Sequence, residues 1–130
     1  MAITLVRGRQ DILVAEVSFT FASLAAATFE PAANLPAGSV VVGGDLIVTT
    51  AWDSATSATG TVGDAASNNR YGAAINMKTL GRTALTLTGF RNTVKTVVGV
   101  VVTNVGTPTV GAATLRVFYT IGDRALELQN

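Results

Sequence analysis

The 130-residue sequence contains neither cysteine nor histidine, and only 13% of its residues are charged. The missing cysteines exclude disulfide bonds and thiol chemistry, and the missing histidines remove the commonest metal ligand and general base. The nine basic and eight acidic residues are scattered singly, so no basic stripe marks a nucleic-acid-binding surface. Aromatic residues, at 6%, are too few to interleave with such a stripe. Nucleic acid is therefore not an expected partner.

Long apolar runs of the kind that cross a membrane are also missing. Hydrophobic residues make up 48% of the chain, but the longest charge-free stretch, residues 96–115, is interrupted by Gly99 and Pro108. A bilayer-spanning helix needs about 20 mainly apolar residues. Arg7 and Arg9 interrupt the start of the chain before a signal peptide's apolar run forms. We expect no membrane partner, and the low charge indicates a protein that covers apolar surface by assembling with other copies.

What the sequence has in abundance is Thr, Val, Ala and Gly, a composition that favours strands. Residues 11–21 alternate with period two, which is typical of a half-buried antiparallel strand. Similar alternation predicts strands over 84–90, 93–104 and 112–121. Roughly eight strands with frequent turn signals have the spacing of a sandwich or a barrel. Of these two we expect the sandwich, and the predicted fold is all-β, an antiparallel two-sheet β-sandwich that is jelly-roll-like. The residues expected in or beside its core are Phe19, Trp52, Leu87, Val117 and Tyr119.

The sandwich is expected to be organised around residues 35–64. This stretch leaves a Pro-Gly turn, runs through a Val-rich segment, pauses at Gly43-Gly44, turns over Asp53-Ser54 and returns to Val62. It predicts a β-hairpin, with a bulge at the two glycines that bends the first arm from one sheet into the other. The preceding segment, residues 22–34, is predicted as either a helical turn, which Pro31 would end, or an extended loop.

The chain divides into an N-terminal arm or edge strand, residues 1–10, and a single sandwich domain, residues 11–130. An extended arm exposes backbone donors and acceptors, so it can add as a strand to a sheet edge on another chain. Its arginines can pair with carboxylates of that partner. The candidate partner-contact residues of the arm are Ile3, Leu5, Arg7 and Arg9. The alternative is that residues 3–6 form the first edge strand of the sandwich itself.

No residue pattern indicates catalysis, so we expect no enzyme, no catalytic residue, no cofactor and no metal. Asp45, Asp53 and Asp64 are all expected at turns or strand ends, where Asp bonds the local backbone. A calcium site near Asp53 and Asp64 is the alternative considered, since hard cations need several converging oxygens. No spacing of Glu16 or Glu30 indicates the paired carboxylates of a glycosidase.

Several segments resemble small structural proteins that are encoded beside major capsid proteins in tailed bacteriophages. These segments are LPAG at 35–38, VVVGGDLIVTTAWDS at 40–54, TVGD at 61–64, RYGAAINMKTLGRTALT at 70–86 and LRVFYTIGDRALEL at 115–128. The better understood proteins of this kind are head decoration, or cement, proteins with jelly-roll-like sandwiches. The pattern consists of strands and turns without functional side chains.

The resemblance implies a non-enzymatic virion protein that is made in the bacterial host cytoplasm and stabilises the outer surface of a phage head. Its implied partners are the major capsid protein and itself, as a homotrimer in the first place and a dimer in the second. The alternatives are a tail, neck or fibre component, a carbohydrate-binding sandwich and a small hydrolase. A fibre would show repeats or heptads, and the sequence has neither.

Overall fold

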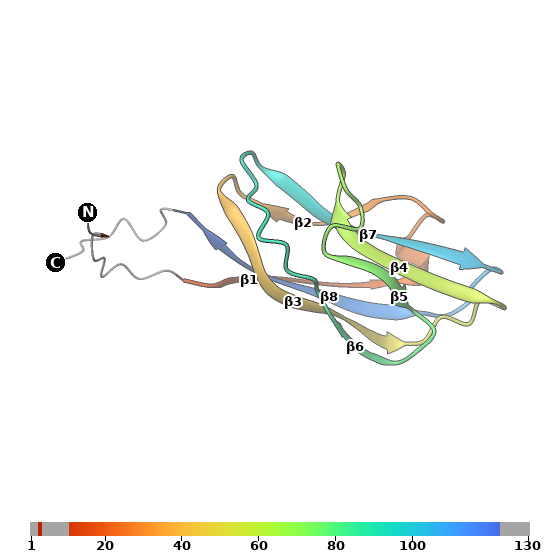
Figure 1. Ribbon diagram of the computed structural model, residues 1–130. Helices are drawn as coiled ribbons and strands as arrows, with labels where there is room; N and C mark the ends of the chain where they lie inside the picture. Colours follow the sequence, from red (N-terminus) through yellow and green to blue (C-terminus); the bar gives the residue numbers. More distant parts are fainter. Residues whose placement is uncertain (1–2, 4–10, 123–130) are drawn as a thin grey trace.

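The computed structural model describes residue 3 and residues 11–122. Two four-stranded antiparallel sheets pack face to face (Figure 1). The first sheet has the order β1 (Leu13–Thr20), β8 (Ala112–Ile121), β3 (Ser39–Thr50), β6 (Gly81–Ala84). The second has the order β2 (Glu30–Leu35), β7 (Thr96–Val105), β4 (Ser57–Asp64), β5 (Gly72–Asn76). The orders 1-8-3-6 and 2-7-4-5 are those of an eight-stranded jelly roll, so the predicted fold class is confirmed.

The core lies between the two sheets and is built by the period-two alternation of the strands. On β8, Leu115 and Val117 are fully buried while their sequence neighbours face outward. Phe19, Trp52, Val117 and Tyr119 lie in or against the core as predicted. The prediction for Leu87 is wrong, because β6 ends at Ala84 and residue 87 lies outside the sheet with its side chain 55% exposed.

The predicted hairpin of residues 35–64 is wrong. β3 pairs with β6 and β8, whereas β4 pairs with β5 and β7, so the two arms lie in opposite sheets. The chain crosses between the sheets over residues 51–56. There Trp52 is buried, and its backbone N–H donates to the carbonyl of Met77 at 3.0 Å. Because this large ring is buried at the end of the sandwich, the chain crosses to the second sheet and does not turn back to pair with β3.

The predicted bulge near the glycine pair is confirmed, but it does not move the strand between sheets. The register of β3 against β8 shifts between Val41 and Gly43, and β3 continues in the same sheet to Thr50. Gly44 has a φ of +128°, and a Cβ there would lie 2.2 Å from the carbonyl oxygen of Arg116. The glycine is therefore required at this position, both by its positive φ and by the close approach of the β8 backbone.

Residues 22–34 combine the predicted turn with a strand that was not predicted. A 3-10 turn, η1 (Phe21–Ser23), follows β1, and β2 begins at Glu30. Pro31 is compatible with β2 because this strand lies at the edge of its sheet, where the missing N–H leaves no inter-strand hydrogen bond unmade. Within residues 11–122, no helix is long and apolar enough to cross a membrane.

Both ends of the described chain lie at one end of the sandwich, which we call the terminal end (Figure 1). β1 and β8 are antiparallel neighbours with Leu13 opposite Tyr119, so the chain enters β1 where it leaves β8. The loops 36–38, 65–71 and 88–95 lie at the same end. Backbone hydrogen bonds from Gly122 to Gly38 and from Gly38 to Asn92 join the loops 36–38 and 88–95 to each other and to the end of β8.

Candidate partner-contact surfaces

The predicted arm lies mostly outside the described residues. Ile3 is 93% exposed and has no regular structure. Leu5, Arg7 and Arg9 lie outside the described part, so the arm and its boundary at residue 10 stay a prediction. The structure does fix the arm's attachment point: Asp11 stands two residues before β1, the edge strand of the first sheet, at the terminal end.

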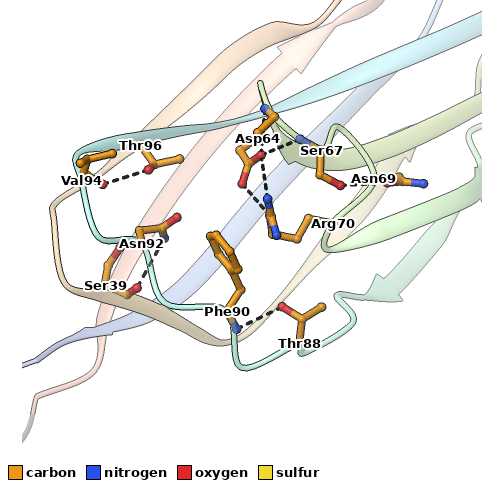
Figure 2. Close-up of polar contacts among 11 residues, drawn as sticks. Ser39, Asp64, Ser67, Asn69, Arg70, Thr88, Phe90, Asn92, Val94 and Thr96 are labelled. Atoms are coloured by element: carbon orange, nitrogen blue, oxygen red, sulfur yellow. Dashed lines mark hydrogen bonds and ion pairs between the residues drawn. The ribbon is translucent and has the colours of Figure 1, made fainter.

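In the second sheet, at the end of β4, Asp64 and Arg70 form an ion pair that fixes the loop 65–71 (Figure 2). The Asp64 carboxylate accepts hydrogen bonds from the backbone N–H groups of Ala66 at 3.1 Å and Ser67 at 2.8 Å, and from Arg70 Nε at 2.7 Å. Burial disfavours the charged form of Asp64, but Arg70 and the two amides outweigh it and lower its pKa. The Arg70 guanidinium stacks 3.6 Å from the centre of the Phe90 ring.

A cavity of about 370 Å³ lies beside this pair. Phe90 and Val94 contribute apolar lining, Lys95 contributes a positive charge, and Asp64 and Arg70 line the cavity as a neutralised pair. The segment 88–95, which carries Phe90, Val94 and Lys95, is held to the start of β3 by Asn92. The buried side-chain amide of Asn92 donates to Ser39 Oγ at 3.0 Å (Figure 2). The terminal end thus presents an apolar notch with the cationic Lys95 in its lining, which suits an apolar side chain and a carboxylate of a partner.

The outer face of the first sheet carries a row of alternating charges. Glu16 of β1 lies opposite Arg116 of β8, and Arg116 lies opposite Asp45 of β3. Asp45 accepts hydrogen bonds from Arg116 Nε at 2.8 Å and Nη2 at 2.6 Å, and from Arg82 Nε of β6 at 2.5 Å. The alternating signs make this face locally neutral.

The charge row also buries its central carboxylate. Leu46 points into the core, so its neighbour Asp45 points outward, yet Asp45 is only 1% exposed because the two arginine side chains lie over it. The hydrogen bonds from Arg116 lower the pKa of Asp45 against the effect of burial. The expectation that Asp45 lies at a turn or strand end is wrong, because it lies inside β3.

Asp53 lies at the opposite end of the sandwich and stabilises a loop. Its carboxylate accepts hydrogen bonds from the N–H groups of Thr109 at 2.6 Å and Val110 at 3.1 Å, and from the Thr109 hydroxyl. The bond from this hydroxyl, together with the two amides, lowers the pKa of Asp53 to about 2. This is the backbone-bonding role that the sequence analysis set against metal binding.

A calcium site shared by Asp53 and Asp64 does not fit this arrangement. The strand β4 (Ser57–Asp64) separates the two residues, and seven steps of about 3.3 Å place the two ends of β4 about 23 Å apart. Calcium ligands lie within about 2.6 Å of the ion. Within residues 11–122, no group of three acidic, histidine or cysteine side chains converges as a metal site would require.

No protein-family model matches the sequence, and no curated protein matches it significantly. Solved structures do match. A chain of the cyanophage Pam1 capsid asymmetric unit superposes with a TM-score of 0.70 and 27% identity, over 93% of this chain and 91% of that chain. A chain of the acid-stable capsid of Helicobacter pylori bacteriophage KHP30 gives 0.70 and 19%, over 90% of this chain and 94% of that chain.

A chain from the capsid of Ralstonia phage GP4 superposes with a TM-score of 0.62 and 19% identity, over 93% of this chain and 90% of that chain. At 19% identity, the KHP30 and GP4 likenesses show the fold alone. All three cover nearly the whole length of both chains. The jelly roll described above is thus a fold found in chains of phage capsid structures.

Proposed function

We propose that this chain is a non-enzymatic structural protein of a phage virion, a decoration or cement protein on the outer surface of the head. The observation that carries the proposal is the likeness to a chain of the Pam1 capsid, at 27% identity over nearly the full length of both chains. The resemblance of segments 35–38, 40–54, 61–64, 70–86 and 115–128 to phage structural proteins supports it as well. Its partners are then the major capsid protein and further copies of itself, and it is made in the bacterial host cytoplasm.

The terminal end of the sandwich is the face that we assign to the capsid. The arm, residues 1–10, is attached there, and the notch around Phe90 and Arg70 opens there. An arm and a notch at one end allow the protein to bind the lattice by strand addition and by insertion of a partner side chain at the same time. Ile3 and Leu5 then supply apolar contact, and Arg7 and Arg9 pair with carboxylates of the capsid.

The test is binding of purified protein to phage heads that lack it. We expect saturable co-sedimentation at a fixed ratio to the major capsid protein and a higher temperature of head disruption. Absence of binding to heads contradicts the proposal, and binding to isolated tails in its place supports the alternative of a tail, neck or fibre component.

A deletion of residues 1–10 tests the arm separately. We expect the truncated protein to melt at the same temperature as the full chain and to lose head binding. If it unfolds many degrees earlier, residues 3–6 belong to the sandwich as its first edge strand, and the arm hypothesis is wrong.

A further inference from the structure

Each sheet has two edge strands among the described residues, and three of these four edges carry features that hinder further pairing. β2 contains Pro31 and a register shift between Pro31 and Ala33. β5 contains Ala74 at a positive φ of 54°, and β6 is only four residues long. Natural sheets use such irregularities, prolines and short edges to prevent association with other chains.

β1 is the exception. It pairs with β8 over eight consecutive positions, from Leu13–Tyr119 to Thr20–Ala112, without a register shift. It contains no proline and no basic residue, and Glu16 is its one charge. A long regular edge of this kind is a template for an additional strand.

The space beside β1 is apolar and incompletely filled. A cavity of about 200 Å³ lies between β1 and β2, and Val17, Phe19, Leu24 and Val100 are among the residues that line it. The inward-facing residues of β1 are only half-buried, whereas Leu115 and Val117 on the adjacent β8 are fully buried. A further strand on this edge would cover apolar surface that water now contacts, and such burial is favourable.

We propose that β1 pairs antiparallel with β1 of a second copy about a two-fold axis at Val17. This deepens the proposed function, because it assigns a surface to the self-association that a decoration protein requires. Residues that face each other in an antiparallel pair point to the same side of the sheet. In a symmetric pair of identical strands, one residue must therefore face its own copy, and the two-fold axis lies midway between these two copies. An axis at Glu16 would bring two carboxylates opposite each other, which is unfavourable.

An axis at Val17 makes the strand self-complementary. Glu16 then faces Ser18 of the second copy, and Ala15 faces its Phe19, so polar residues meet on the outer side and apolar residues on the inner side. An axis at Ser18 would shorten the overlap within β1 from residues 14–20 to residues 16–20. We assign the edge to a second copy of this chain because polar residues then face polar residues, apolar residues face apolar ones, and the two Glu16 carboxylates do not face each other.

The pairing joins the first sheet of one copy to the first sheet of the other. The result is one eight-stranded sheet with the two β1 strands at its centre. It gives a dimer, in place of the trimer that the sequence resemblance implied. A single strand pair buries less than the roughly 800 Å² per partner of an ordinary stable interface. We therefore expect a dissociation constant in the micromolar range, which simultaneous contacts with a capsid lattice would strengthen.

The first test introduces charges of opposite sign at Ser18, next to the dimer axis. Ser18→Lys places an ammonium group opposite Glu16 of the second copy, twice per dimer, and Ser18→Glu places a carboxylate there. Both variants lose the hydrogen bond between Ser18 and Thr114 alike, so they are matched. In sedimentation velocity from about 1 to 100 µM, we expect dimerisation to tighten several-fold with Lys and to weaken several-fold with Glu. Ala73→Lys and Ala73→Glu, on the exposed edge β5, should change nothing.

The second test uses the absence of cysteine to determine the register. Glu16→Cys and Ser18→Cys are prepared separately and then mixed under oxidising conditions. We expect a covalent dimer only in the mixture, because residue 16 faces residue 18 of the second copy. Two copies of residue 16 would lie about 8 Å apart, which is too far for a disulfide.

Three results would overturn this proposal. The first is an equal change in the dimer dissociation constant for Ser18→Lys and Ser18→Glu, the second is no covalent dimer in the mixture, and the third is a covalent dimer from Glu16→Cys alone. Loss of dimerisation on deletion of residues 1–10 would also overturn it, because the arm of the second copy would then occupy the edge. These tests use isolated protein. A dimer that does not bind heads therefore counts against the proposed function alone, and a monomer that binds heads counts against the dimer alone.

Discussion

Asp45→Asn is the substitution that tests the charge row of the first sheet. Asparagine keeps the size of the side chain but cannot act as the anionic acceptor of the three hydrogen bonds from Arg116 and Arg82. Removal of one partner of a buried ion pair costs roughly 3–5 kcal/mol. Here the side chains of Arg116 and Arg82 are 35% and 58% exposed and regain water, so we expect a smaller loss of about 2 kcal/mol. That corresponds to a melting temperature lower by roughly 6 °C.

The same substitution has a defined pH dependence. The folded pKa of Asp45 is lowered, so its stabilisation is fully present above the unfolded pKa of about 3.9 and is lost as pH falls through the folded pKa. In urea titrations followed by circular dichroism, the stability difference between wild type and Asp45→Asn should be constant from about pH 5 to 7 and shrink below about pH 4.

Glu16→Gln is the matched control, because Glu16 is the exposed end of the same row, and we expect less than about 0.5 kcal/mol. Unfolding of Asp45→Asn at the wild-type urea concentration at pH 7 would contradict the stabilising role of Asp45. A stability difference that is the same at pH 3 as at pH 7 would contradict it equally.

Three further predictions follow from burial, close approach and loop bonding. Leu115→Ala in the core should cost about 3 kcal/mol in urea unfolding and Leu87→Ala less than about 0.5, and equal losses would contradict the core described above. Gly44→Ala should lower the melting temperature by 10 °C or more or prevent folding, since its Cβ would lie 2.2 Å from the Arg116 carbonyl oxygen, and a wild-type melt would contradict this. Asp53 has a pKa lowered to about 2, so its stabilisation is present above about pH 4 and is lost as pH falls toward 2. Asp53→Ala should speed hydrogen exchange at the Thr109 amide, and unchanged exchange would contradict the loop-bonding role.

The strands with one buried face could be predicted from the sequence. The predicted strands 11–21 and 112–121 correspond to β1 (Leu13–Thr20) and β8 (Ala112–Ile121), because alternation of apolar and polar residues directly reflects burial of one face. β2 (Glu30–Leu35) could not be predicted in this way. Pro31 usually indicates that a strand is interrupted, and it is acceptable here only because β2 lies at the edge of its sheet.

Which strands pair with each other could not be predicted from local sequence patterns. The sequence of β3 and β4 is compatible with a hairpin, but the burial of Trp52 and the crossing at residues 51–56 place the strands in opposite sheets. The charge row depends on contacts between Asp45 and residues 37 and 71 positions away. No short-range pattern specifies such a register, so the central role of Asp45 and the open edge of β1 became evident only in the fold.

The most direct measurement of the central claim is an electron cryomicroscopy map of the phage virion that contains this chain. We expect jelly-roll density of this topology on the outer surface of the head, with the terminal end, where β1 begins and β8 ends, facing the major capsid protein. Density for this chain in the tail, neck or fibres, or its absence from the head surface of a complete virion, would contradict the claim.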